Sequence, residues 1–304
     1  MRTVLTQRAS VCYTISSIMC LMSDAVADNA LLQEQVLNMR FLFWNTNNNK
    51  SINPILTELV IGNRIDCVIL AEYSADASDL ICTLSFHGFV MTPQCTVGCK
   101  RITILSKSPL EPGQQNTNFS LQIVPGSFIL CCVHLPSNIY EDAVDKRPFL
   151  IKEIIEAITN TELKNNMENT IITGDFNINP FSMECIQADL FNSMPHYDIA
   201  NNKVKTIYGK DYFPFYNPMW RFLGDCSQPF GTYYHEKNGI SNIYWHILDQ
   251  VMIRPSLRER FLDDSLKIIT ESISWSLLDE NGHPDSTKVS DHLPIMFELK
   301  ENLS

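Results

Sequence analysis

Gly174-Asp175-Phe176-Asn177-Ile178-Asn179-Pro180 (GDFNINP) follows directly on the apolar run Thr170–Thr173 (TIIT). The apolar run predicts a buried strand, and the Gly-Asp pair that ends it predicts a turn. Asp175 and Asn177 are two residues apart, and residues at that spacing in an extended turn project to the same side. The stretch therefore predicts a strand that brings a carboxylate and an amide to one point at its end.

Polar side chains stand at the ends of other apolar runs in the same way. Glu72 ends VILAEY, His134 ends ILCCVHL, and Asp249 opens LDQVMI, while Asp291 and His292 precede LPIMFEL. One polar residue at a strand end is usually only solvated, but carboxylates gathered at one point repel one another unless a cation neutralises them. The joint pattern predicts a metal site, and oxygen ligands without Cys favour Mg²⁺ or Mn²⁺ over zinc.

This set of side chains is typical of an enzyme that hydrolyses phosphate esters. The reaction needs a metal to offset charge on the phosphoryl oxygens, a base for the attacking water and donors for the remaining oxygens. The carboxylates, imidazoles and amides at the strand ends supply each of these parts. A Mg²⁺- or Mn²⁺-dependent phosphodiesterase is therefore the predicted class of enzyme.

The remaining sequence predicts helices interleaved with strands, which indicates an α/β sandwich of packed layers. Helical spacing of apolar residues predicts helices over Ile52–Val60, ended by Gly62-Asn63, and over about Phe149–Ile158. Pro-Gly turns at Pro112-Gly113 and Pro125-Gly126 are expected to join sequential antiparallel strands. Apolar and β-branched runs predict further strands at Met39–Trp44, Asp66–Tyr73, Arg101–Ser106, Phe119–Val124, Phe128–His134, Ile247–Ile253 and Pro294–Leu299.

Composition excludes several classes of protein. A chain of 304 residues with 45% hydrophobic and 19% charged residues can bury a sizeable core, and no apolar run approaches the roughly 20 residues that a membrane span needs. The net charge of −11 excludes a polybasic binder, so any polyanion must be held by a local site or a metal. The 10 Cys residues form no C-x-x-C pair, which argues against a zinc ribbon and favours a reducing compartment.

The sequence predicts two parts of the chain: an N-terminal extension over residues 1–38 and one catalytic domain over residues 39–304. The apolar stretch Ala9–Met22 before Ala25-Val26-Ala27 loosely follows a signal-peptide layout, although Tyr, Thr and Ser residues dilute it. We therefore expect a cytoplasmic protein, or a secreted one if residues 1–27 act as a signal peptide. The sequence predicts no particular protein partner.

Two of the motifs resemble those of the endonuclease/exonuclease/phosphatase superfamily, which includes deoxyribonuclease I, exonuclease III-type AP endonucleases, inositol polyphosphate 5-phosphatases and neutral sphingomyelinases. These motifs are GDFNINP and Ser290-Asp291-His292-Leu293-Pro294 (SDHLP). The resemblance covers about Met39 to Leu299 and implies a four-layer α/β sandwich, with two packed mixed sheets flanked by helices. It is supported by Trp44-Asn45, Glu72, Ile104–Leu110 (ILSKSPL), His134-Leu135 and Leu248-Asp249-Gln250.

The resemblance implies that Glu72 binds the divalent metal, with Asn45 close by and Asp291 near the same ion. Nucleases of the family often carry an acid or Gln two residues after the Asn of the first loop. This chain has Asn47 there, a departure that leaves the affinity for metal and the number of ions open.

The resemblance also implies catalytic roles. Asp175 would activate or orient the attacking water, Asn177 would hold a phosphate oxygen, and His292, fixed by Asp249, would stabilise charge in the transition state. His134 would donate to the phosphate or protonate the leaving oxygen. Which carboxylate acts as the base stays open. The acid that pairs with the middle histidine in deoxyribonuclease I has no obvious counterpart; the candidates are Asp76, Asp79 and Glu111.

Nearly half of the Phe, Trp and Tyr residues lie between Phe191 and His246, in the segment that precedes Asp249. Interleaved with basic residues, these aromatic side chains could stack on nucleobases above the metal site, or they could pack a long loop against the sandwich. We expect substrate contacts from Arg101, Tyr233 and Trp245. The prediction is a nuclease acting on DNA or RNA by metal-assisted attack of water.

Two other functions fit parts of the pattern. A phosphoinositide phosphatase or a sphingomyelinase-type phosphodiesterase is compatible with the same core, but the sequence contains no amphipathic membrane helix or basic lipid-facing surface. A non-catalytic binding module on the same fold predicts the loss of site residues. All of these residues are present in the chain.

Overall fold

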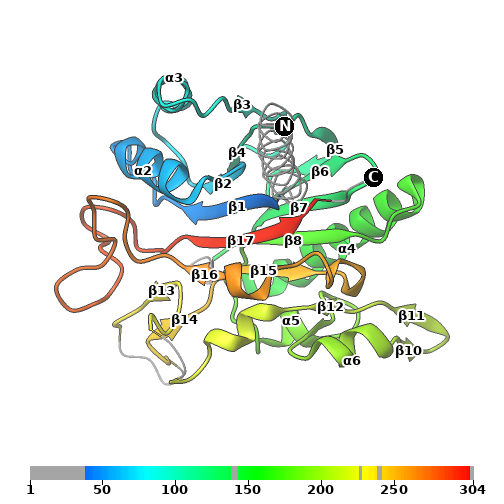
Figure 1. The fold of residues 1–304 in the computed structure, drawn as a ribbon. Coiled ribbons are helices and arrows are strands. Elements are labelled where there is room, and N and C mark those ends of the chain that lie inside the picture. The colour runs from blue at the N-terminus through cyan, green and yellow to red at the C-terminus, as the bar shows by residue number, and fades with distance from the viewer. Residues whose placement is uncertain (1–37, 138–142, 226–227, 238–241, 302–304) are drawn as a thin grey trace, which may run out of the picture. The chain divides into compact units, whose positions relative to one another are not determined.

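The computed structural model describes residues 38–137, 143–225, 228–237 and 242–301 (Figure 1). The predicted extension therefore lies outside the described residues except for Asn38, and so does the signal-like segment 1–27. Asn38 is the first residue of strand β1, one residue before the predicted start of the catalytic domain. Residues Asn38–Asn302 belong to one compact unit.

Six strands form the first sheet, in the order β16-β17-β1-β2-β4-β3. Strands β1 and β2 run parallel, and every other neighbouring pair is antiparallel, so the sheet is mixed. The strands are β1 (Asn38–Asn45), β2 (Cys67–Ala71), β3 (Thr92–Pro93), β4 (Ile102–Ser106), β16 (Lys267–Ile268) and β17 (Ile295–Lys300).

Seven strands form the second sheet, in the order β5-β6-β7-β8-β15-β12-β9. The pairs β7/β8 and β9/β12 are parallel and the others are antiparallel. The strands are β5 (Glu111–Asn116), β6 (Phe119–Val124), β7 (Phe128–His134), β8 (Thr170–Asp175), β9 (Ser193–Met194), β12 (Phe215–Tyr216) and β15 (Asp249–Ile253). Two short hairpins lie outside the large sheets: β10 (Lys205–Ile207) with β11 (Lys210–Tyr212), and β13 (Tyr233–Tyr234) with β14 (Trp245–His246).

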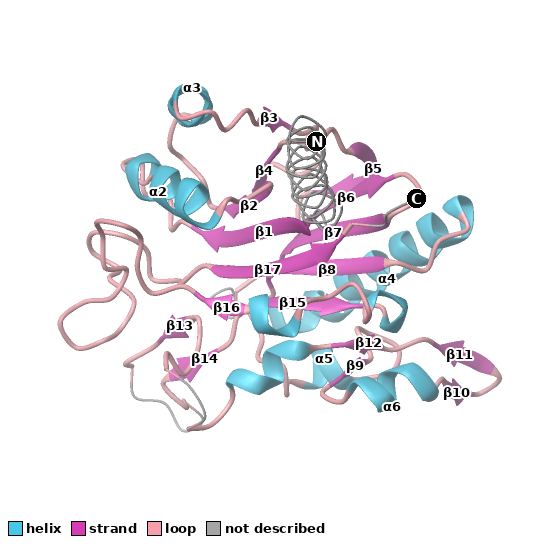
Figure 2. Ribbon diagram, viewed as in Figure 1, coloured by secondary structure: helices cyan, strands magenta, loops and turns pink. Residues whose placement is uncertain are grey.

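Helices lie on the outer faces of the two sheets (Figure 2). Alternate residues of β7 show the layering, because Leu130 belongs to the core shared with β1 and β2, whereas Cys131 belongs to a second core that includes Ile154 of α4. The described helices are α2 (Asn53–Asn63), α3 (Ala77–Phe86), α4 (Ala143–Asn165), α5 (Met183–Ile186) and α6 (Tyr197–Asn202), with 3₁₀ turns at Pro218–Phe222, Pro255–Leu257 and Asp263–Ser265. The arrangement confirms the predicted α/β sandwich of two packed mixed sheets flanked by helices.

The strand registers bring the predicted site residues to one edge of the second sheet. His134 of β7 is opposite Asp175 of β8, and Asp175 is in turn opposite Asp249 of β15. In the first sheet, Asn45 at the end of β1 is opposite Ala71, and Glu72 follows immediately. Residues 130 positions apart in sequence then meet, since the Asn45 amide bonds the Asp175 carboxylate.

Two predictions of local structure are wrong. Pro112-Gly113 is not a turn between strands but part of the edge strand β5, where the register with β6 shifts between Pro112 and Gln115. An edge strand tolerates Pro because its outward N–H is not needed for pairing. The helix expected at about Phe149–Ile158 extends over Ala143–Asn165, with Pro148 inside it. In the part of the chain that the structure describes, no helix is long and apolar enough to cross a membrane.

Candidate active site

The Asp175 carboxylate lies at the centre of the candidate site and is 1% exposed. Its Oδ2 accepts hydrogen bonds from Asn45 Nδ2 at 3.0 Å and Asn177 Nδ2 at 3.1 Å, and its Oδ1 accepts from the Asn177 backbone N at 2.9 Å. Asn177 Nδ2 also donates to the carbonyl of Leu135 at 2.9 Å. The predicted pairing of Asp175 with Asn177 is therefore present, and the bonds fix the direction of both side chains.

Backbone conformation explains why the GDFNINP turn has its sequence. Gly174 has φ 155°, and a Cβ at this residue would lie 1.9 Å from the carbonyl oxygen of Val133 in the neighbouring strand. Only Gly fits such a close approach. Asn177 has φ 51°, a left-handed conformation that Asn adopts more readily than most residues. Glu72, at the end of β2, has φ 48° and shares this less common conformation. Such conformations tend to occur at functional sites.

Glu72 and His134 face each other across the junction of the two sheets. His134 Nε2 lies 3.4 Å from Glu72 Oε1 and 3.7 Å from Asp175 Oδ2. The second oxygen of Glu72 accepts from Asn48 Nδ2 at 2.8 Å. The hydrogen bond from His134 lowers the pKa of Glu72 against the opposing effect of burial, so this carboxylate is ionised at neutral pH.

The three acids considered as partners of His134 lie elsewhere. Asp76 caps helix α3 through the backbone N of Ser78, Asp79 accepts from Asn53, and Glu111 is exposed on the edge strand β5. The acids next to His134 are Glu72 and Asp175, both at Nε2. Its Nδ1 is buried without a hydrogen-bond partner among the described residues.

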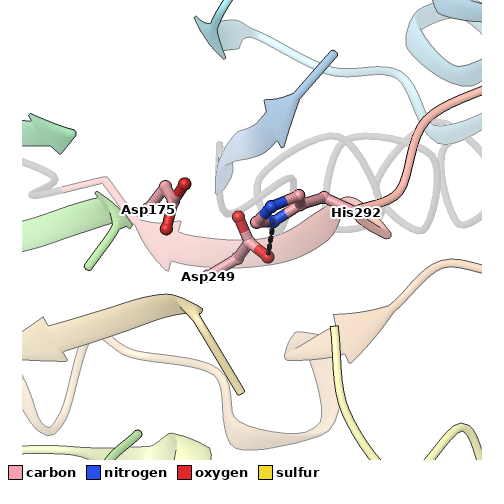
Figure 3. A group of neighbouring side chains, drawn as sticks. All are labelled: Asp175, Asp249 and His292. Carbon is pink, nitrogen blue, oxygen red and sulfur yellow. Dashed lines mark hydrogen bonds and ion pairs between the residues drawn. The ribbon is translucent and has the colours of Figure 1, made fainter. Parts of the chain in front are cut away.

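Asp249 and His292 form a buried pair in which Nδ1 of the imidazole lies 2.8 Å from Asp249 Oδ2 (Figure 3). Burial opposes the charged imidazole, but the charge of Asp249, followed by that of Asp175, raises the pKa of His292 to about 10. Burial raises the pKa of Asp249, and the charge of His292 opposes this rise. The His292 backbone carbonyl accepts a hydrogen bond from Trp44 Nε1 at 2.8 Å. The geometry presents a fixed positive charge close to Asp175.

Asp291 lies next to the pair and is partly exposed. Burial raises the pKa of its carboxyl, and the negative charges of Glu72 and Asp175 raise it further against the opposing charge of His292. These three acids therefore influence one another electrostatically. Their mutual repulsion is the condition under which a bound cation stabilises a site.

The donor atoms fit a hard divalent cation. Asp175, Asp249 and His292 offer ligand atoms that all lie within 4.8 Å of one another, but a protonated His292 bonded to Asp249 through Nδ1 has no free lone pair for a metal. Carboxylate oxygens and one amide remain as donors, from the residues Asn45, Glu72, Asp175 and Asp291. Asp249 Oδ1 is also buried without a hydrogen-bond partner among the described residues. Such oxygen donors suit Mg²⁺ or Mn²⁺.

Of the three residues expected to contact substrate, Tyr233 lies nearest the pair, with its ring centroid 4.8 Å from that of His292. Trp245 packs edge-on against Tyr234 at 5.3 Å and is half-buried. The backbone carbonyl of Arg101 accepts a hydrogen bond from the backbone N of Glu72, so the two residues lie side by side.

Several residues around the site carried no individual sequence prediction. Ser290 Oγ donates to the carbonyl of Asn45 at 2.7 Å and accepts from the backbone N of His292 at 3.1 Å, which links the SDHLP turn to the end of β1. Asn48 holds Glu72, and Thr232 accepts from the backbone N of Asp249. Ser290 lies inside a recognisable motif, but Asn48 and Thr232 stand in loops, where a sequence pattern gives no signal of a partner.

Solved structures of other proteins superpose on this fold. No family model and no curated protein matches the chain. A 3'-5' exonuclease (NExo) from Neisseria meningitidis superposes with a TM-score of 0.50 at 15% identity, over 86% of this chain and 100% of that one. A 3' phosphatase NExo from Neisseria, bound to a product DNA hairpin, gives 0.49 at 15% identity over 86% and 99% of the two chains. An AP endonuclease from Archaeoglobus fulgidus gives 0.48 at 15% identity, over 85% and 98%.

The chain thus has the α/β sandwich fold of the Neisseria meningitidis exonuclease. This is the fold that the GDFNINP and SDHLP motifs imply through their resemblance to the endonuclease/exonuclease/phosphatase superfamily.

Proposed function

We propose that the protein is a divalent-metal-dependent phosphoesterase that hydrolyses phosphodiester bonds, and that its substrate is DNA or RNA. The observation that carries the proposal is the meeting, at one edge of the two sheets, of an oriented carboxylate (Asp175), two further acids (Glu72 and Asp291) and a protonated imidazole (His292) held by Asp249. These are the groups that hydrolysis of a phosphodiester requires.

Glu72, Asp291 and Asn45 are the residues proposed to hold a Mg²⁺ or Mn²⁺ ion. When bound, the ion supplies positive charge that polarises the phosphoryl group. Glu72 is suited to this role because its carboxylate is ionised at neutral pH. Asn45 stands between the two parts of the site, since its Nδ2 bonds Asp175 while its Oδ1 accepts from the backbone N of Asn47 at 3.0 Å.

Asp175 is the proposed base. Hydrogen bonds from Asn45 and Asn177 hold both of its oxygens, so the carboxylate is oriented before it accepts a proton from an attacking water. Asn177 also offers an amide to a phosphate oxygen. His134 Nε2 lies between Glu72 and Asp175, within reach of a phosphate or leaving oxygen that enters between these acids.

His292 is the proposed stabiliser of charge in the transition state. Its imidazolium is oriented through Nδ1 by Asp249, which leaves the Nε2 proton for a phosphoryl oxygen. A preorganised donor of this kind needs no rearrangement when negative charge develops on the phosphoryl group.

A nucleic acid is the substrate that the surroundings of the site favour. Tyr233 lies beside His292, and half-exposed aromatic side chains can stack on bases of any sequence. The exonuclease from Neisseria meningitidis with the same fold is described as a 3'-5' exonuclease. The net charge of −11 implies that the grip on a polyanion is local to the site.

The test is cleavage of labelled single- and double-stranded DNA and RNA by the purified protein, with and without Mg²⁺. Asp175→Ala and a chelator are the controls, because the variant exposes any contaminating nuclease. Cleavage that is lost in both controls supports the proposal. If all four polymers survive while bis(4-nitrophenyl) phosphate is hydrolysed, the substrate is not a nucleic acid and phospholipids or inositol phosphates are tested next. Inertness toward every substrate would point to a binding module.

A further inference from the structure

Thr232 is a fully buried residue that bonds to the chain on both sides of the Asp249–His292 pair. Its Oγ1 accepts hydrogen bonds from the backbone N of Leu248 and of Asp249, each at 3.1 Å. Its own carbonyl accepts from the backbone N of Leu293 at 2.8 Å, one residue after His292. One residue thus connects the two segments whose side chains form the pair.

The side-chain bonds replace strand pairing that is missing at this point. On one side of β15, Asp249 is opposite Asp175 of β8. On its other side, β15 pairs with β12 only between Ile253 and Tyr216, at the far end of the strand. The backbone N–H of Asp249 therefore has the Thr232 hydroxyl as its acceptor, and a buried N–H without an acceptor is costly.

The backbone around Thr232 is closely packed against β14. Gly231 packs so closely that a Cβ there would lie 2.4 Å from the carbonyl oxygen of His246. The backbone N of Thr232 donates to the same His246 carbonyl at 2.9 Å, and Tyr233 forms a bridge with His292. Backbone hydrogen bonds thus hold the segment Gly231–Tyr233 between β14 and the SDHLP turn.

We propose that Thr232 is a positioning residue, whose hydroxyl sets the place of Asp249 relative to His292 and thereby the direction in which His292 presents its free nitrogen to the substrate. Thr232 is fully buried and its Oγ1 bonds backbone N–H groups, so it acts through Asp249. Asp249 reaches His292 at 2.8 Å, a distance that depends on where the first residue of β15 stands. The catalytic meaning of this contact rests on the proposed phosphoesterase function.

Thr232→Val isolates the hydroxyl. The two side chains have similar size, and the Val variant keeps both backbone bonds of residue 232. It therefore removes only the hydroxyl, which accepts from the backbone N of Leu248 and Asp249 and also lowers the pKa of the Asp249 carboxyl as a hydrogen-bond partner. Thr232→Ser restores the acceptor without the methyl group. Thr173→Val is the matched control, because Thr173 is equally buried and its Oγ1 bonds the carbonyl of Gln250, the neighbour of Asp249, at 3.0 Å.

The first measurement is steady-state hydrolysis of bis(4-nitrophenyl) phosphate by the four proteins. We expect Thr232→Val to lower kcat by about tenfold to a hundredfold, the range for loss of groups that orient a reacting residue, with KM unchanged. Thr232→Ser should recover most of kcat, and Thr173→Val should stay close to the wild type. Wild-type kcat in Thr232→Val, or an equal loss in Thr173→Val, would overturn the proposal.

The second measurement is deuterium uptake by peptides that cover residues 246–250 and 290–293. Thr232→Val should raise uptake in both, whereas Thr173→Val should leave residues 290–293 unchanged. This readout separates the two proposals. If the wild type hydrolyses no phosphoester, the proposed function fails. Unchanged deuterium uptake at residues 290–293 in Thr232→Val would refute the positioning role of Thr232. If Thr232→Val does not fold, Thr232→Cys takes its place, since sulfur is a weak acceptor.

Discussion

Replacing Asp249 by Asn tests the electrostatic basis of the candidate site. The Asp249 carboxylate lies 2.8 Å from His292 Nδ1 and both side chains are buried. The pKa of His292 is raised from 6.5 to about 10, which corresponds to about 5 kcal/mol in favour of the imidazolium at 1.36 kcal/mol per pKa unit. Asp249 is the first of the groups that raise this pKa against burial. In Asp249→Asn, burial keeps its full effect while the largest opposing charge is gone.

We therefore expect the pKa of His292 in Asp249→Asn to fall to its usual value or below, so that most of the imidazole is neutral at pH 7.5. Loss of the preoriented charge should lower kcat by about a hundredfold to a thousandfold. NMR titration of the His292 ring protons gives the pKa, and hydrolysis of bis(4-nitrophenyl) phosphate gives kcat. Asp66→Asn is the matched control, because Asp66 binds Lys107 at the opposite end of β2 and the variant has the same net charge.

Two results would contradict this reasoning. If His292 of the wild type titrates near 6.5, the pair does not hold a charge and the imidazole is not a preformed cation. If Asp249→Asn lowers the pKa of His292 but keeps the kcat of Asp66→Asn, the charge exists and does not serve the reaction. Either result would require a different donor for the phosphoryl oxygens.

Three further predictions follow from the same geometry. Gly174→Ala should lower the free energy of unfolding by more than about 3 kcal/mol, since the added Cβ would overlap the Val133 carbonyl. Gly126→Ala should lower it by about 1 kcal/mol, because Gly126 has φ 70° and open space around it. Urea denaturation of both variants measures the two losses. Equal losses in the two variants would rule out the close approach. Glu72→Gln should raise the Mg²⁺ concentration for half-maximal activity by tenfold or more, and an unchanged Mg²⁺ dependence would exclude Glu72 as a ligand. Because the pKa of His292 is raised to about 10, the Asp249–His292 pair stabilises the fold fully below pH 6.5 and loses this contribution as the pH rises through about 10. The free energy of unfolding should therefore decline over this pH window more in the wild type than in Asp249→Asn. Parallel pH profiles of the two proteins would argue against a charged pair.

Sequence periodicity located the main strands because each of them is buried on at least one face. The run Phe128–His134 is predicted with the bounds that β7 has, since alternate residues pack into two different cores and leave no polar face. Short elements such as β13 and β14 were not predicted. They consist of two residues each and are held by pairing with each other and by the bond from the Thr232 backbone N to the His246 carbonyl, not by a hydrophobic pattern.

In the candidate site, too, the sequence predicted some features and not others. Strand ends and turn motifs predicted which polar residues would meet, because the ends of neighbouring strands share an edge of the sheet. Pairwise partners were beyond the sequence: Asp76, Asp79 and Glu111 were the candidates for the acid that pairs with His134. The fold instead places Glu72 and Asp175 beside this imidazole. Asn48 and Thr232 could not be found for a related reason, since a loop residue acquires its partner from the fold and not from its neighbours in sequence.

The same features that make the site reactive also explain how the fold tolerates it. Glu72, Asp175 and Asp291 raise one another's energy as anions, and the charge of the buried His292 opposes this rise at Glu72 and at Asp291. The fold offsets this cost with neutral donors: Asn45 and Asn177 satisfy Asp175, and Asn48 satisfies Glu72. Amides add hydrogen bonds without cancelling the negative charge, so the carboxylates keep their affinity for a cation. A cationic side chain in place of one of these Asn residues would cancel part of the negative charge that attracts a metal.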